Sequence, residues 1–212
     1  MTITHHLDDA TLMSFAAGSL PAALAAVAAA HAAMCPRCRR EIAVLERFGG
    51  ALMAGLQPVD LLAGGPRMPP ASEPRAEARA GAGAGDAEVP SPVTGLIRGS
   101  LDDVAWRWLG PGVWDHVIPI QGAGKLRLLK VAPEHHIPEH GHGGSELTLV
   151  LRGSFHDQTG RYLRGDISDL DEDVEHHPLI DGDVDCISLV ASEAPEQFHG
   201  LVARQWQRLR QF

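Results

Sequence analysis

Hydrophobic positions recur at helical spacing in the first part of the chain. A first helix is predicted from about residue 9 to residue 17, because Asp8 or Asp9 can cap its start and Gly18 can end it. A second helix is predicted to begin near Pro21, since proline fits a first helical turn. Its apolar face repeats at i, i+3, i+4 and i+7, at Leu24, Val27, Ala28 and His31. His31 is therefore expected to continue a buried face.

A third helix is predicted to begin near Pro36. Its apolar residues alternate steps of four and three and predict one long seam: Cys38, Ile42, Leu45, Gly49, Leu52 and Leu56. A further amphipathic helix is predicted over residues 92–104, and it could pack with either half of the chain. These segments add up to four helices.

The character of the chain changes twice after the third helix. Residues 64–90 are dominated by Gly, Pro, Ala and charged residues, which predicts a flexible linker. From Trp106 onward the apolar residues alternate with their neighbours, and glycine-containing turns recur at short intervals, as in an all-β sandwich or barrel. We therefore expect a multidomain α and β protein, with a helical domain over residues 1–101 and a β domain over residues 104–203.

Composition narrows the classes of function. The formal net charge is −9, most of it after residue 90, and an acidic chain is a poor candidate for direct nucleic-acid binding. No apolar run is long enough to span a membrane, and the first residues lack the pattern of a signal peptide. These features predict a cytoplasmic protein without direct contacts to a membrane or nucleic acid.

Candidate metal ligands cluster near the start of the chain. His31-x3-Cys35-x2-Cys38 places three ligands within eight residues, and Cys35 would cap the third helix, where the dipole favours a thiolate. His6 is the natural fourth ligand, with His5 as the competitor, and zinc is the default metal for such a set. The alternatives are a redox-active Cys-x2-Cys pair, which no βαβ pattern supports, and two unpaired thiols.

This motif on a small helical bundle resembles the zinc-containing anti-sigma family. The resemblance implies a four-helix bundle that clamps a sigma factor of the extracytoplasmic-function class. In that interpretation, the domain masks the sigma-factor surfaces that RNA polymerase and promoter DNA require.

A second set of ligands follows in the β region. His140-Gly-His142 presents two imidazoles on one side of a strand, and Glu146 follows after a glycine-rich bend. The pattern H-x-H-x3-E-x6-G resembles the first motif of the cupin family, which implies an antiparallel β-barrel. The second cupin motif would supply His176, or else His177, although residues 169–175 lack the usual P-x-G turn.

Three imidazoles and one carboxylate suit Zn, Mn, Fe, Ni or Cu. His135 and His136 are expected to belong to a surface loop. Cys186, in a predicted strand, is expected to be a packed core thiol.

Together the two motifs resemble anti-sigma factors of photosynthetic proteobacteria in which a zinc-binding helical domain is joined to a cupin domain. The resemblance implies two zinc sites, a structural one in the clamp and one in the cupin domain that responds to a stress of the singlet-oxygen type. It also implies a regulatory protein with no catalytic activity.

The alternative function is a metal-dependent cupin enzyme, such as a dioxygenase, with an accessory helical domain. A thiol redox switch at Cys35 and Cys38 could coexist with the anti-sigma function.

Overall fold

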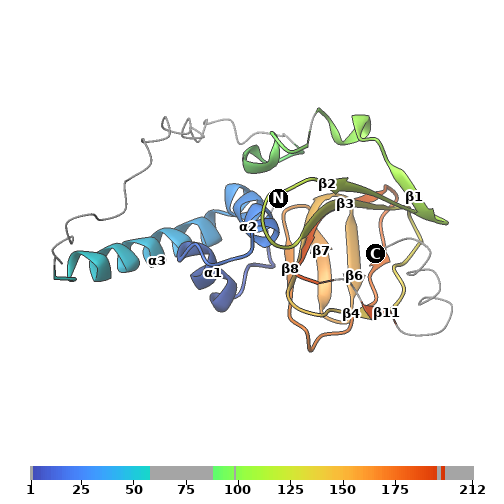
Figure 1. Ribbon diagram of the computed structural model, residues 1–212. Coiled ribbons are helices and arrows are strands. Elements are labelled where there is room, and N and C mark those ends of the chain that lie inside the picture. The colour runs from blue at the N-terminus through green and yellow to red at the C-terminus, as the bar shows by residue number, and fades with distance from the viewer. Residues whose placement is uncertain (1, 58–87, 98, 195–196, 199–212) are drawn as a thin grey trace.

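A computed structural model describes residues 2–57, 88–97, 99–194 and 197–198 of the chain. Three α-helices lie beside a region of antiparallel sheets (Figure 1). All but the last three residues of the predicted linker over 64–90 lie outside the described residues. The predicted division at residues 101–104 stays a prediction.

The three N-terminal helices are α1 (Asp9–Ala16), α2 (Ala22–Met34) and α3 (Pro36–Ala54), as predicted. Asp8 caps α1 by accepting a hydrogen bond of 2.6 Å from the Thr11 backbone N–H. Cys35 ends α2 and also caps α3, so the two helices meet at a single residue. Among the described residues, no helix is long and apolar enough to cross a bilayer.

The prediction of a fourth α-helix over residues 92–104 is wrong. Two 3-10 helices stand in its place, η1 (Ser91–Val93) and η2 (Leu101–Asp103). Gly99 has a φ of +85°, which breaks the helical path, and Ser100 caps a new turn. The four apolar residues predicted to face inward were Val93, Leu96, Ile97 and Leu101. Val93, Ile97 and Leu101 are buried, because the segment lies as a strap on the core, whereas Leu96 is 37% exposed.

The β region is built from short antiparallel strands in three sheets. A six-stranded sheet has the order β1-β2-β3-β10-β5-β8, a three-stranded sheet the order β7-β6-β9, and β11 pairs with β4. The strands are β1 (Arg107–Gly110), β2 (Val113–Ile118), β3 (Lys125–Val131), β4 (His140–Gly141), β5 (Glu146–Arg152), β6 (Ser154–Asp157), β7 (Gly160–Leu163), β8 (Ile167–Leu170), β9 (Leu179–Ile180), β10 (Cys186–Ser192) and β11 (Gln197–Phe198).

The predicted closed barrel is wrong, because no ladder of hydrogen bonds joins the six-stranded and three-stranded sheets in the described residues. The chain passes from one sheet to the other at Gly153, between β5 and β6. Gly153 has a φ of +72°, and a Cβ atom there would lie 2.7 Å from the Asp185 carbonyl oxygen. The strands therefore turn a sharp corner, and the region is an antiparallel sandwich.

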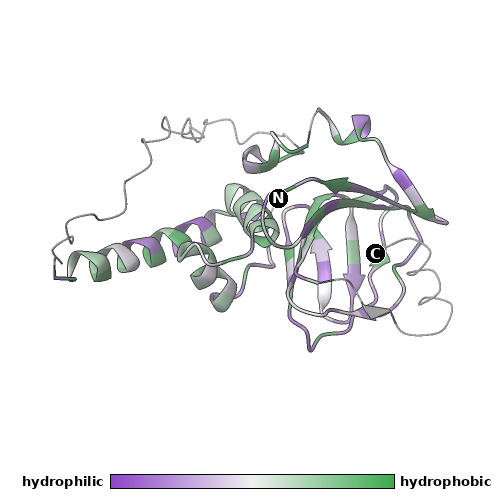
Figure 2. Ribbon diagram, in the orientation of Figure 1, coloured by the Kyte–Doolittle hydropathy of each residue, from purple (hydrophilic) through white to green (hydrophobic). Residues whose placement is uncertain are grey.

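One hydrophobic core runs through both regions. Helix α2 packs against β3, β5 and β10 of the six-stranded sheet, and η1 packs on α2. Figure 2 shows hydrophobic residues along most of α2. Small side chains allow this close approach, since three alanines of α2 are fully buried: Ala23, Ala28 and Ala30. A second cluster of buried residues, which includes Phe155, Tyr162 and Ile180, fills the space near the three-stranded sheet.

The long seam predicted for α3 is only half buried. Cys38 and Ile42 are buried, but Leu52 is 60% exposed and Leu56 is 65% exposed. Helix α3 extends away from the sheets beyond the end of α1 (Figure 1). Val44, Phe48 and Leu52 recur every four residues and are all exposed. We call these three residues the α3 stripe.

Leu101→Ala is expected to lower the free energy of unfolding by about 2–5 kcal/mol, because the Leu101 side chain on the strap is fully buried against the core. Urea denaturation followed by circular dichroism measures this change. Leu96→Ala is the matched control on the same strap, since Leu96 is 37% exposed. Equal losses in the two variants would contradict the packing of the strap.

Candidate metal centres

Four ligand-bearing side chains of the helical region converge on one point. His6, His31, Cys35 and Cys38 each offer one ligand atom, and these atoms lie within 4.8 Å of one another. His31 Nε2 lies 3.3 Å from Cys38 Sγ, and His6 Nδ1 lies 3.3 Å from Cys35 Sγ and 3.7 Å from Cys38 Sγ. The structure therefore brings together the whole ligand set predicted for this site.

Local structure places each of these ligands. His31 lies in the last turn of α2, and Cys35 and Cys38 lie at the cap and in the first turn of α3. The Cys38 backbone N–H donates to Cys35 Sγ at 3.5 Å, so the Cys35 side chain caps the start of α3. His6 comes from the extended segment before α1. The competitor His5 turns away, and its ring lies 4.3 Å from that of Tyr162.

The protonation states suit a metal cation. Burial lowers the pKa of His31 to about 4, so its imidazole is neutral at pH 7. His31 Nδ1 lies 3.0 Å from the Gly165 carbonyl oxygen, which can only accept, so Nδ1 carries the proton and Nε2 turns a lone pair to the cluster. Burial raises the pKa of Cys38 to about 12, so a metal would have to displace its proton.

The spacing of the ligand atoms fits a tetrahedral ion. With zinc–sulfur bonds of about 2.3 Å and zinc–nitrogen bonds of about 2.0–2.1 Å, the edges of such a tetrahedron measure roughly 3.3–3.8 Å. The three nitrogen–sulfur distances in the cluster fall in this range. Two thiols and two imidazoles can therefore hold a zinc ion here with little rearrangement.

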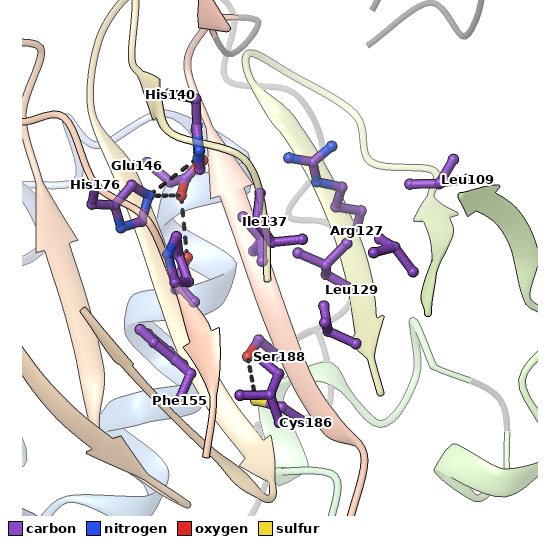
Figure 3. Close-up of a pocket in the computed structure, with 16 residues that line it drawn as sticks. Leu109, Arg127, Leu129, Ile137, His140, Glu146, Phe155, His176, Cys186 and Ser188 are labelled. Carbon is purple, nitrogen blue, oxygen red and sulfur yellow. Dashed lines mark hydrogen bonds and ion pairs between the residues drawn. The ribbon is translucent and has the colours of Figure 1, made fainter. Parts of the chain in front are cut away.

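A second cluster lies in the β region. His140, His142, Glu146 and His176 are all buried, and their ligand atoms also lie within 4.8 Å of one another. His140 is on β4 and Glu146 begins β5, while an isolated bridge pairs His140 with His176. Figure 3 shows His140, Glu146 and His176 directed toward one another. His177, the alternative to His176, is exposed, and its ring packs against that of His136.

Hydrogen bonds orient the imidazoles of this second cluster. His140 Nδ1 donates to the Pro138 carbonyl oxygen at 2.8 Å, and His176 Nδ1 donates to Asp157 Oδ2 at 3.0 Å. The two Nε2 atoms then lie 3.1 Å apart. Burial lowers the pKa of His140 to about 4, so its Nε2 can offer a lone pair to a metal cation at pH 7.

Buried polar atoms that lack hydrogen-bond partners also indicate that the second cluster could bind a metal ion. Both ring nitrogens of His142 and Glu146 Oε2 are buried without a hydrogen-bond partner, and His142 Nδ1 and Glu146 Oε2 lie 3.4 Å apart, an ion pair only if the imidazole is protonated. Such groups are costly in a sheet interior unless something binds them. Three imidazoles and one carboxylate thus fit a metal ion, and this donor set does not select one metal over another.

Sequence reasoning missed the residues that orient the ligands. Asp157 lies on β6 and Gly165 between β7 and β8, far along the chain from His176 and His31. Their roles depend on tertiary contacts. The only local signal at either position is the turn sequence around it.

A cavity of about 60 Å³ adjoins the second cluster. Its wall is mainly apolar, with Arg127, His140, Glu146 and His176 on its polar side (Figure 3). Cys186 also lines it, and burial raises the pKa of this thiol to about 12. Cys186 is therefore a packed thiol, as predicted.

Comparisons with known proteins agree with both halves of the chain. Residues 95–195 match the family model described as the ChrR cupin-like domain. The chain is 40% identical over 205 residues to the anti-sigma-E factor ChrR of Cereibacter sphaeroides, covering 96% of each protein. It also matches a chain in the crystal structure of Rhodobacter sphaeroides SigE in complex with the anti-sigma ChrR. That match has a TM-score of 0.74 and 38% identity, and it covers 90% of this chain and 100% of that one.

In the chelator-treated protein, His31 is expected to stay a neutral Nδ1–H tautomer as the pH falls from 7 toward 5. In the urea-unfolded chain it should titrate at its ordinary pKa of 6.5. Since the unfolded state takes up this proton first, His31 should make the folded protein less stable as the pH falls from about 6.5 to about 4. Long-range ¹H–¹⁵N NMR identifies the tautomer. A folded-state His31 that is protonated at pH 6 would contradict the burial described.

Proposed function

The chain belongs to the ChrR family of anti-sigma factors, and on that premise we propose that it binds and inhibits an extracytoplasmic-function sigma factor. The observation that carries the proposal is the extent of the relationship, since one alignment covers 96% of the chain at 40% identity. An anti-sigma factor acts in the cytoplasm, where its partner meets RNA polymerase. A regulatory function follows from binding, without turnover.

The α3 stripe supplies the surface for that partner. It presents three apolar side chains, each more than half exposed, on a helix that extends beyond the rest of the described structure (Figure 2). Exposed apolar rows of this kind mark protein interfaces. The net charge of −9 favours a partner with a basic surface, as expected of a DNA-binding protein.

The N-terminal cluster would hold zinc in a closed structural site. Its ligands come from the segment before α1, from the end of α2 and from the start of α3, so one ion would join three segments of the helical region. Bound zinc would keep both cysteines as thiolates and favour the folded arrangement of the helices. His31 stays in place through its hydrogen bond to Gly165.

The second cluster would hold a metal ion, zinc in our proposal, in a cupin-like domain over residues 104–203 that controls the helical domain over residues 1–101. His140, His142 and His176 would supply neutral imidazoles and Glu146 a carboxylate. We assign this domain the response to a stress of the singlet-oxygen type, after which the sigma factor is released. The support for this part is the family relationship.

Metal analysis of the purified protein is expected to give about two equivalents of zinc per chain. Cys38→Ser and Glu146→Gln should each reduce the content to about one equivalent, because each removes a ligand from a different cluster. Cys186→Ser is the control and should leave the content unchanged. One equivalent or less in the unaltered protein would refute the two-site proposal.

Phe48→Asp in the α3 stripe is expected to weaken sigma-factor binding by about 2 kcal/mol or more, roughly 30-fold, because a charge would replace an apolar anchor in the interface. Binding is measured by calorimetry with the metal-loaded protein. Arg47→Ala, at an exposed neighbouring position on the same helix, is the matched control. If Phe48→Asp binds as tightly as the control, the α3 stripe is not the docking surface.

A further inference from the structure

The turn between β7 and β8 hydrogen-bonds to residues of the N-terminal metal cluster and of the segment that carries His6. The Gly165 carbonyl oxygen accepts from His31 Nδ1 at 3.0 Å. Asp166 Oδ1 accepts from the backbone N–H groups of Thr4 and His5 at 2.6 and 2.9 Å. One turn of the β region thus orients His31 directly and holds the segment that carries His6.

A second aspartate holds the other side of that segment. Asp169, on β8, accepts from the Asp8 backbone N–H at 3.0 Å and from Thr11 Oγ1 at 3.3 Å. His6 therefore lies between two anchored stretches of backbone, residues 4–5 and 8–11. The position of this ligand depends on carboxylates that are more than 150 residues away in the sequence.

Gly165 lies where the helical region contacts the β region, in a backbone conformation that favours glycine. Its φ is +91°, and a Cβ atom there would lie 3.0 Å from Ile3 Cδ1 and 3.4 Å from Met34 Cε. A residue with a side chain would strain the turn that presents this carbonyl oxygen to His31. Asp166 is only 1% exposed, so water does not compete for its hydrogen bonds.

The same turn is tied to the strand that begins with a ligand of the second cluster. The Gly165 N–H donates to the Val150 carbonyl oxygen at 2.8 Å, and the Val150 N–H donates to the Asp166 carbonyl oxygen at 3.1 Å. In the β5–β8 ladder, Glu146 lies opposite Leu170 and Leu147 lies opposite Asp169. A continuous backbone ladder therefore leads from Glu146 to both anchoring aspartates.

We propose that Gly165, Asp166 and Asp169 are positioning residues of the N-terminal metal site and that β5 and β8 couple this site to the cupin-like metal site. The inference rests on the proposed function, which places a metal in each cluster. A metal that holds Glu146 would order the start of β5 and the paired β8, and so tighten metal binding near His31. By linkage, a metal in the N-terminal site would tighten the other site by the same factor.

Cobalt(II) is the probe that separates the two sites, because only the N-terminal cluster has thiolates and only it gives a sulfur-to-cobalt charge-transfer band. Asp166→Ala is expected to lower the cobalt affinity of that site by about 10- to 100-fold, as when outer partners of metal ligands are removed. Asp166→Asn keeps Oδ1 as the acceptor for Thr4 and His5 but loses the acceptor of the Leu163 backbone N–H, so it should restore part of the affinity.

Asp181→Ala is the matched control. It also removes a carboxylate that accepts side-chain hydrogen bonds in the β region, but those bonds come from Ser154 and Arg161. It should leave the charge-transfer titration unchanged. Equal losses in the Asp166→Ala and Asp181→Ala variants would reduce Asp166 to a general contributor to stability and would overturn the positioning role.

Coupling is tested with Glu146→Gln. This change should weaken the N-terminal cobalt site in the otherwise unaltered chain and have little further effect in the Asp166→Ala background. If Glu146→Gln leaves the charge-transfer titration unchanged while two metals still bind to the unaltered chain, the coupling is refuted and the proposed function stands. If the unaltered chain binds no metal at either cluster, the proposed function itself fails.

Discussion

The packing of α2 on the six-stranded sheet is the constraint on which both halves of the structure depend. The helix places small residues against β3, β5 and β10, and a bulkier face would hold it away from the sheet. This close approach brings His31 within hydrogen-bond distance of Gly165. It also carries the α2–α3 junction, and with it both cysteines, to the edge of the β region. The N-terminal cluster is therefore built on an interface between the two regions.

Local patterns in the sequence indicated which side chains the structure brings together in the two clusters. The helical spacing from Leu24 to His31 fixes the face that His31 shares, and the start of α3 brings Cys35 and Cys38 to the same point. In the same way His140 and His142 follow the two-residue period of an extended chain, and Glu146 follows a short bend. Each of these relations spans only a few residues, so secondary structure brings three members of each cluster close together, while His6 and His176 reach their clusters through tertiary contacts.

Features that depend on tertiary contacts were not predicted. The strap over residues 92–104 buries Val93, Ile97 and Leu101 at helical spacing, but Gly99, with its positive φ, and the adjacent core replace the helix with two 3-10 turns. The corner at Gly153 divides the sheets and prevents a closed ladder. The seam of α3 is apolar to its end, yet no described residue covers the last two turns. Apolar periodicity shows that a face needs a partner, and it does not say whether that partner is in the same chain.

The central claim is that this chain holds a sigma factor through its helical region. Its most direct test is calorimetric titration of the metal-loaded full-length protein with an extracytoplasmic-function sigma factor from the same organism. The account predicts a one-to-one complex with a Kd of about 1 µM or tighter. No detectable heat or complex with both metal sites filled would contradict it.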